Sequence, residues 1–162
     1  MENHKAFTLI ELLVVISIIG LLASIVLVSV NSARNKARDS KREADFGQIY
    51  KAIEVARDRD NKVLKDITGS GCSDCACRGV GDLSILPDSH SCIVGHTTAF
   101  QRIGLAALSR DPWGSPYLID ENELEYVANP CRKDYLRTAG PDRVLSTGDD
   151  IGLSIPFFTA CQ

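Results

Sequence analysis

The chain has 162 residues, of which 44% are hydrophobic and only 6% aromatic, and its formal net charge is −3. This length predicts one soluble domain together with a membrane segment, and the low aromatic content limits the size of the core. The slightly acidic balance excludes nucleic-acid binding driven by the charge of the whole chain.

An apolar run without a charged residue extends from Leu12 to Val30. As a helix it would span roughly the 30 Å hydrocarbon core of a membrane. Glu11 stands at the head of this helix, where a charge is costly unless it is paired. A secretory signal peptide would have a basic start and an apolar segment of about 7–15 residues. Here residues 1–5 carry no net side-chain charge, and the apolar run is longer than that of a signal peptide, so we favour a helix that is retained in the mature protein. A signal anchor that is never processed is the other alternative.

The segment Lys5-Ala6-Phe7-Thr8-Leu9-Ile10-Glu11 resembles the class III signal of type IV pilins and type II secretion pseudopilins. In that family a dedicated peptidase cuts before the Phe of an F-T-L-I-E motif and methylates the new amine. The resemblance implies a leader of residues 1–6, cleavage between Ala6 and Phe7, and N-methylation of Phe7. The family mostly has Gly before the cut, where this chain has Ala6.

The resemblance also implies that residues 7–30 form a transmembrane helix that becomes part of a filament core. In such a core the carboxylate of Glu11 would have no water around it, and an unpaired ion there is strongly unfavourable. We therefore expect Glu11 to act in subunit assembly by pairing with the amine of Phe7 on a neighbouring subunit.

No proline precedes Pro87, so one unbroken helix can run from Phe7 to about Asp60. In its charged second half, apolar residues recur at three- and four-residue steps, the spacing of one helical face. These residues are Phe46, Ile49, Tyr50, Ile53 and Ala56. We expect this face to pack on a small antiparallel sheet, within a globular domain of residues 31–162.

After the long helix the composition changes sharply. Thr68-Gly69-Ser70-Gly71 breaks any helix, and a loop of small residues extends to Pro87. Apolar side chains between Thr97 and Leu108 predict a second, shorter helix.

Short strands are predicted in the C-terminal third. Two of them, at 117–119 and 124–127, are separated by the polar residues 120–123, which predicts a hairpin. A third strand is expected at 134–138, and 153–161 is a largely apolar tail. The predicted fold is therefore α+β and pilin-like, with a long N-terminal helix on an antiparallel sheet.

All six cysteines lie after residue 71, and their even number favours disulfides in an oxidising compartment. We expect Cys131 to pair with Cys161 and to clamp the tail. The other four, which would pair among themselves, are Cys72, Cys75, Cys77 and Cys92. Those four with His90 and His96 are also candidate zinc ligands, since zinc takes tetrahedral Cys and His ligands. Their spacing matches no common finger or ribbon, so disulfides are favoured.

A second resemblance lies further along the chain. Asp111-Pro112-Trp113-Gly114-Ser115-Pro116-Tyr117 is similar to a D-P-W-G-x-P-Y segment of major pseudopilins, and 138–142 with 148–151 resemble their calcium-binding stretch. The resemblance implies a calcium ion held by Asp142, Asp149 and Asp150. On the residues alone, a polar turn in which these acids bond their own backbone is the alternative.

The basic residues after the apolar run point to a different topology. They are Arg34, Lys36, Arg38, Lys41 and Arg42, against only Asp39. The positive-inside rule would place the C-terminal part in the cytoplasm. The family has the opposite topology, and the disulfides agree with the family. We therefore expect a single-pass plasma-membrane protein with a cytoplasmic N-terminus and an extracytoplasmic domain.

The sequence has no G-x-S-x-G elbow, no H-E-x-x-H motif and no phosphate-binding loop, so we expect a structural protein rather than an enzyme. The resemblance implies a subunit of a helical filament, most like a major pseudopilin of type II secretion. Its partners would be related subunits, the prepilin peptidase, an inner-membrane assembly platform and membrane lipid. The alternatives are a pilin of a surface fibre, used in adhesion, motility or DNA uptake, and a membrane-anchored zinc-binding module.

Overall fold

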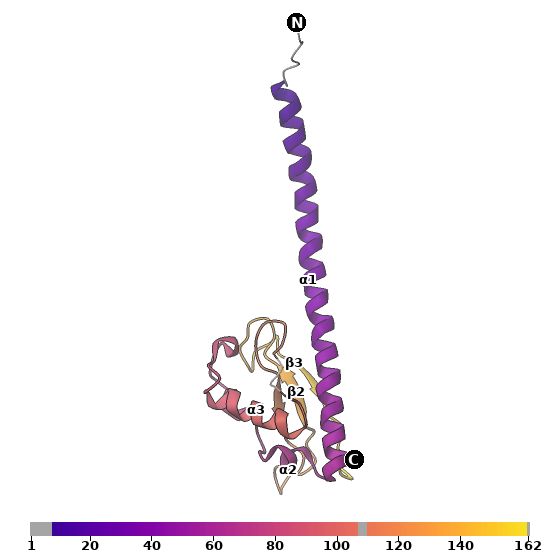
Figure 1. Ribbon diagram of the computed structural model, residues 1–162, viewed down its shortest axis with the longest axis vertical. Helices are drawn as coiled ribbons and strands as arrows, with labels where there is room; N and C mark the ends of the chain where they lie inside the picture. Colours follow the sequence, from indigo (N-terminus) through magenta and orange to yellow (C-terminus); the bar gives the residue numbers. More distant parts are fainter. Residues whose placement is uncertain (1–7, 107–109, 162) are drawn as a thin grey trace. The chain divides into compact units, whose positions relative to one another are not determined.

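The computed structural model describes residues 8–106 and 110–161, and their contacts divide into two compact units, up to Ser40 and from Lys41. The elements in chain order are α1 (Leu9–Asp60), α2 (Leu64–Thr68), two short 3-10 turns η1 (Cys75–Cys77) and η2 (Leu83–Ile85), α3 (Ser91–Arg102), β1 (Leu118–Asp120), β2 (Tyr135–Thr138) and β3 (Ile151–Ser154). They are labelled where space allows in Figure 1.

Helix α1 is unbroken, as the absence of proline predicts. It ends at Asp60, the predicted position, and Asn61 then takes a left-handed φ of 50°, a conformation that asparagine tolerates. The predicted start at Phe7 lies outside the described residues. In the first unit the large apolar side chains are exposed, from 39% at Val30 to 79% at Leu9. Among the described residues, α1 is the one helix long and apolar enough to cross a membrane.

In the second unit, the apolar face of α1 packs on the sheet as predicted. Phe46, Ile49, Ile53 and Ala56 are buried, and Tyr50 lies partly buried at the edge of the same cluster. The sheet and the residues next to its strands contribute the side chains that meet this face: Tyr117, Ile119, Leu136 and Ile155. Figure 1 shows the C-terminal part of α1 beside the strands.

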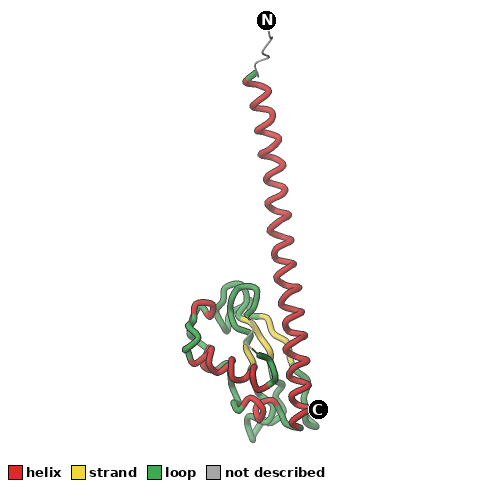
Figure 2. Tube along the Cα trace, viewed as in Figure 1, coloured by secondary structure: helices red, strands yellow, loops and turns green. Residues whose placement is uncertain are grey.

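The sheet has three antiparallel strands in the order β1-β2-β3, drawn in yellow in Figure 2. In the register, Ile119 lies opposite Leu136, which lies opposite Leu153 on β3. Because side chains alternate along a strand, Ile119 joins the core at α1 whereas Leu118 joins a second buried cluster. That second cluster contains Cys77, Leu83, Cys92, Ile93, Ala139 and Leu145, so the cysteine-rich segment covers the opposite side of the sheet.

The predicted hairpin of 117–119 with 124–127 is wrong, because β1 pairs with β2 instead. Two of the acids expected in its turn, Glu121 and Glu123, are buried: Glu121 accepts a hydrogen bond from Ser73 N at 2.7 Å, and burial raises the pKa of its carboxyl. Residues 124–127 form a largely exposed loop, in which Leu124 has a φ of 59°. The polar residues 120–123, which have the composition of a turn, instead bind distant parts of the chain to one another.

The second helix was predicted at 97–108, but α3 begins at Ser91 and ends at Arg102. His90 caps its start, since Nδ1 accepts a hydrogen bond from Cys92 N at 3.2 Å. Gly104, with a φ of 91°, follows its end. Strand β3 was not predicted, because its four residues include a glycine and carry little β signal.

Candidate functional site

The N-terminus of α1 is closed by a reciprocal pair of hydrogen bonds. Glu11 N donates to Oγ1 of Thr8 at 3.2 Å, and Thr8 N donates to Oε2 of Glu11 at 2.9 Å. This is a capping box, in which a Thr before the helix and a Glu three residues later satisfy each other's free amides. The sequence carries the T-x-x-E signature of this cap at Thr8 and Glu11.

The capping box gives Glu11 a contact within its own chain as well as the proposed contact with a neighbouring subunit. The hydroxyl of Thr8 also donates to Oε2 of Glu11, at 2.9 Å. The cleavage and methylation residues, Ala6 and Phe7, lie outside the described residues. Glutamine can fill the same capping role as glutamate, so charge and capping can be separated by substitution.

The six cysteines form three disulfides, and the pairing follows the predicted division. Cys131 is joined to Cys161 across 30 positions and holds the C-terminal tail. In the chain-entropy model a loop of this length is worth about 3–4 kcal/mol. The other pairs are Cys72–Cys75 and Cys77–Cys92.

The candidate zinc ligands are engaged in other interactions. Each group of three ligand atoms in the cysteine-rich segment contains a disulfide, Cys77–Cys92 beside His96 or Cys72–Cys75 beside Asp74, and zinc binds thiolates rather than disulfides. Nε2 of His96 accepts a hydrogen bond from Ile119 N at 3.1 Å, which leaves the proton on Nδ1, 3.0 Å from the carbonyl oxygen of Cys92. His96 therefore acts as a neutral structural link between α3 and β1.

Acidification should destabilise the protein through His96. Its burial lowers the pKa of the imidazole from 6.5 to about 4. Between these two values the unfolded chain binds a proton that the folded chain does not, so stability falls with the pH, by on the order of 3 kcal/mol in total. Thermal unfolding across this window measures the slope, and His96→Gln should flatten it. An equal slope in wild type and variant would contradict this assignment.

The segment around Trp113 is organised by one buried acid. Oδ1 of Asp111 accepts hydrogen bonds from Trp113 N at 3.0 Å and Ser115 N at 2.9 Å, and burial raises the pKa of this carboxyl. Its other oxygen accepts a hydrogen bond from the hydroxyl of Thr138 on β2. The two segments that resemble a major pseudopilin are therefore in direct contact.

The three acids of the C-terminal loop are tied together by hydrogen bonds. Asp142 N donates to Oδ2 of Asp149 at 3.0 Å, and the hydroxyl of Thr147 donates to Oδ1 of Asp149 at 2.7 Å. These bonds, that from Thr147 foremost, lower the pKa of Asp149. Oδ2 of Asp150 accepts from Ser146 N at 2.7 Å. The acids thus cap the loop's own amides, as in Asx-turns.

The loop closes tightly against Gly140. With a φ of 68° this residue approaches Asp149 so closely that a Cβ would lie 2.3 Å from its carbonyl oxygen and 3.0 Å from its Oδ2. Carboxylate and carbonyl oxygens are the donors that calcium takes, six to eight at a time. The donor types fit calcium, but the three carboxylates are not among the described groups whose ligand atoms lie within 4.8 Å of one another.

A buried charge cluster that the sequence did not predict joins α1 to the C-terminal tail. Arg57 is 1% exposed, and its guanidinium contacts Asp134, Glu123 at 3.5 Å and the carbonyl oxygen of Pro156 at 2.9 Å. Glu123 in turn accepts a hydrogen bond from Thr159 N at 2.7 Å. The only sequence signal was a charged residue next to the apolar face of α1.

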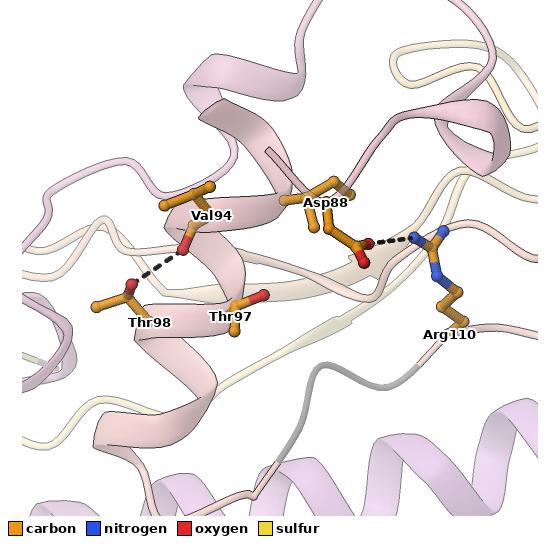
Figure 3. Close-up of a pocket in the computed structure, with 6 residues that line it drawn as sticks. Asp88, Val94, Thr97, Thr98 and Arg110 are labelled. Atoms are coloured by element: carbon orange, nitrogen blue, oxygen red, sulfur yellow. Dashed lines mark hydrogen bonds and ion pairs between the residues drawn. The ribbon is translucent and has the colours of Figure 1, made fainter. Parts of the chain in front are cut away.

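An open pocket of about 370 Å³ lies beside α3, shown in Figure 3. Val94, Thr97 and Thr98 line it from the helix, and Asp88 and Arg110 point toward one another at 3.9 Å. Asp88 is 97% exposed, so this ion pair is solvated. The pocket offers water-exposed charges and threonine hydroxyls, not a buried acid beside a nucleophile.

Comparison with known proteins gives one match to the N-terminal segment and others to almost the whole chain. Residues 1–27 match the family model of the prokaryotic N-terminal methylation motif. Almost the whole chain is similar to type II secretion system core protein G of Klebsiella pneumoniae, with 28% identity over 94% of this chain and 95% of that protein. The protein of the same name in Escherichia coli (strain K12) is 28% identical over 93% of this chain and 90% of its own. No solved structure gives a significant match.

Proposed function

We propose that this chain, which belongs to the family of type IV pilins and type II secretion pseudopilins, is a structural subunit of a pilus-like helical filament. One observation carries the proposal: a methylation motif leads directly into a long apolar helix whose second half packs on a small antiparallel sheet. The exposed apolar half of α1 needs an apolar environment, which a membrane supplies before assembly and neighbouring helices supply afterwards.

Within this family the role closest to the sequence is that of a major pseudopilin in type II secretion. The similarity to core protein G extends over more than nine-tenths of the chain, and the contact between Asp111 and Thr138 joins the two segments that resemble major pseudopilins. Before assembly the subunit would be anchored in the plasma membrane, with its globular domain outside the cytoplasm, where disulfides persist. Related subunits, the prepilin peptidase and an assembly platform would be its partners.

A pilin of a surface fibre is the second candidate role. The feature that favours it is the cysteine-rich segment, which carries two disulfides close together and exposes Cys75. Deletion of the gene separates the two roles. Loss of a secreted enzyme from the medium supports the pseudopilin, whereas loss of adhesion, motility or DNA uptake with normal secretion supports the pilin.

Processing by the peptidase should remove residues 1–6. We expect the intact mass of the chain from membranes to be that of residues 7–162 plus one methyl group on Phe7. Ala6→Gly should be processed at least as well, because the family mostly has glycine before the cut, and a large charged residue in place of Ala6 should block processing. A wild-type chain that keeps Met1 in assembled filaments would contradict this prediction.

The C-terminal loop is proposed to hold calcium through Asp142, Asp149 and Asp150. A divalent cation would relieve the mutual repulsion of three carboxylates that stand within nine positions and would draw their oxygens together. Gly140 leaves the space that this closure needs. Calcium would thereby fix the loop that connects β2 to β3.

Calcium should therefore raise the melting temperature of the full chain relative to a chelator. Binding to the folded form alone adds about 2.7 kcal/mol at a hundredfold excess over Kd. Asp142→Asn and Asp150→Asn should abolish the increase, and magnesium should substitute poorly because it demands tighter octahedral geometry. Asp88→Asn removes an exposed acid that lies outside this loop and serves as the control. If the wild-type melting temperature is the same in calcium and in chelator, the loop binds no calcium and is only a polar turn.

A further inference from the structure

We propose that Arg34, Lys36 and Arg38 form a basic collar that binds the phosphate headgroups of anionic phospholipids where α1 leaves the membrane. The inference rests on the proposed membrane anchoring of α1. It does not depend on whether the filament acts in secretion or as a surface fibre. The inference also explains why basic residues follow the apolar run, although the positive-inside rule would then place the domain in the cytoplasm and the family topology places it outside.

The position of the collar along α1 matches the headgroup layer. If the hydrocarbon core ends near Val30, Arg34 lies about 6 Å and Arg38 about 12 Å beyond it at the rise of an α-helix. The polar layer of a bilayer extends about 5–7 Å beyond the hydrocarbon on each side. Helical side chains lean toward the N-terminal end, here toward the membrane, and long basic side chains reach the phosphates from such positions.

The collar surrounds the helix. Successive residues turn by about 100° in a helix of 3.6 residues per turn, so Arg34 and Arg38 lie about 40° apart and Lys36 lies on the opposite side. Lipid headgroups surround a membrane helix on all sides, whereas a docked protein covers one face. This distribution favours lipid over an acidic patch on a protein partner.

The three side chains are available for such a ligand. All three are exposed, and none has an ion pair or hydrogen bond in the described part of the chain. Lys41, one helical turn further on, is instead paired with Asp45 at 2.6 Å. The charges nearest the apolar segment are therefore the unpaired ones.

The test uses the full chain reconstituted in phosphatidylcholine vesicles that contain phosphatidylglycerol. Spin-labelled phosphatidylglycerol and phosphatidylcholine report which lipid associates with the protein. A basic residue near a membrane surface contributes about 1 kcal/mol, equivalent to about fivefold in association. We expect the wild-type chain to prefer phosphatidylglycerol over phosphatidylcholine by about fivefold or more, and R34Q/K36Q/R38Q to lose this preference. High salt should weaken it, because the Debye length falls to about 3 Å at 1 M.

The control is K51Q/K62Q/K133Q, which removes the same charge from three other exposed lysines and should keep the preference. Equal preference in wild type and the collar variant, or equal loss in both triple variants, would overturn the proposal and point to a protein partner or to general charge. Extraction at alkaline pH tests the anchoring separately. A wild-type chain that is washed off contradicts the membrane-anchored subunit, whereas one that stays without a headgroup preference contradicts only the collar.

Discussion

Filaments should not incorporate a chain in which Glu11 is replaced by glutamine, although that chain should still insert into the membrane. In the proposed filament core, Glu11→Gln leaves the amine of Phe7 on the next subunit without its counter-charge. Removing one partner of a buried ion pair costs about 3–5 kcal/mol, which lowers an association constant by a hundredfold or more. The yield of sheared filaments, normalised to the membrane content of the same chain, measures the loss.

The capping box allows this loss to be assigned to charge. Glu11→Gln keeps a capping side chain, whereas Thr8→Ala keeps the charge and removes the hydroxyl that Glu11 bonds. Loss of a cap costs about 0.5–2 kcal/mol, so Thr8→Ala should reduce the yield far less. A normal yield from Glu11→Gln with a large loss from Thr8→Ala would show that Glu11 acts only by closing its own helix.

Arg57→Ala should strongly destabilise the second unit. It leaves the buried carboxylates of Asp134 and Glu123, each 1% exposed, without their cation. Breaking a buried pair on one side costs about 3–5 kcal/mol, which for a domain of this size lowers the melting temperature by roughly 10–20 °C. Thermal unfolding of the full chain in mild detergent measures the change.

Arg59→Ala provides the matched control, because Arg59 lies two residues further along α1 in an exposed pair with Asp60. An exposed pair is worth about 0–1 kcal/mol, so the melting temperature should change little. Asp134→Asn should destabilise the chain as Arg57→Ala does, since Asp134 also accepts hydrogen bonds from Asn122 N and Glu123 N at 2.7 and 2.8 Å. Equal effects from Arg57→Ala and Arg59→Ala would contradict the role of the buried cluster.

Local signals were sufficient to predict α1. An uncharged apolar run, the absence of proline and apolar side chains at three- and four-residue steps each depend only on neighbouring residues. The structure ends α1 at Asp60 and buries Phe46, Ile49, Ile53 and Ala56 on one face, as these signals predict. The capping box of Thr8 and Glu11 is equally local and could have been predicted as well.

The sheet was harder to predict because its strands are held by distant partners. Residues 120–123 have the composition of a turn, yet Glu121 bonds Ser73 and Glu123 bonds Thr159, 48 and 36 positions away. No periodicity shows such contacts. The acidic loop falls between these cases, because a polar turn is predicted from its residue types, whereas the partners of its hydrogen bonds depend on the folded loop.

Electron cryo-microscopy of sheared filaments tests the central proposal most directly. The chain is expressed with the prepilin peptidase and assembly platform of a type II secretion system, and the filaments are imaged and identified by mass. We predict helical filaments built from this chain, with the apolar half of α1 in the core and the unit from Lys41 onward on the outside. A processed chain that stays in the membrane without filaments, while a known major pseudopilin assembles in the same cells, would contradict it.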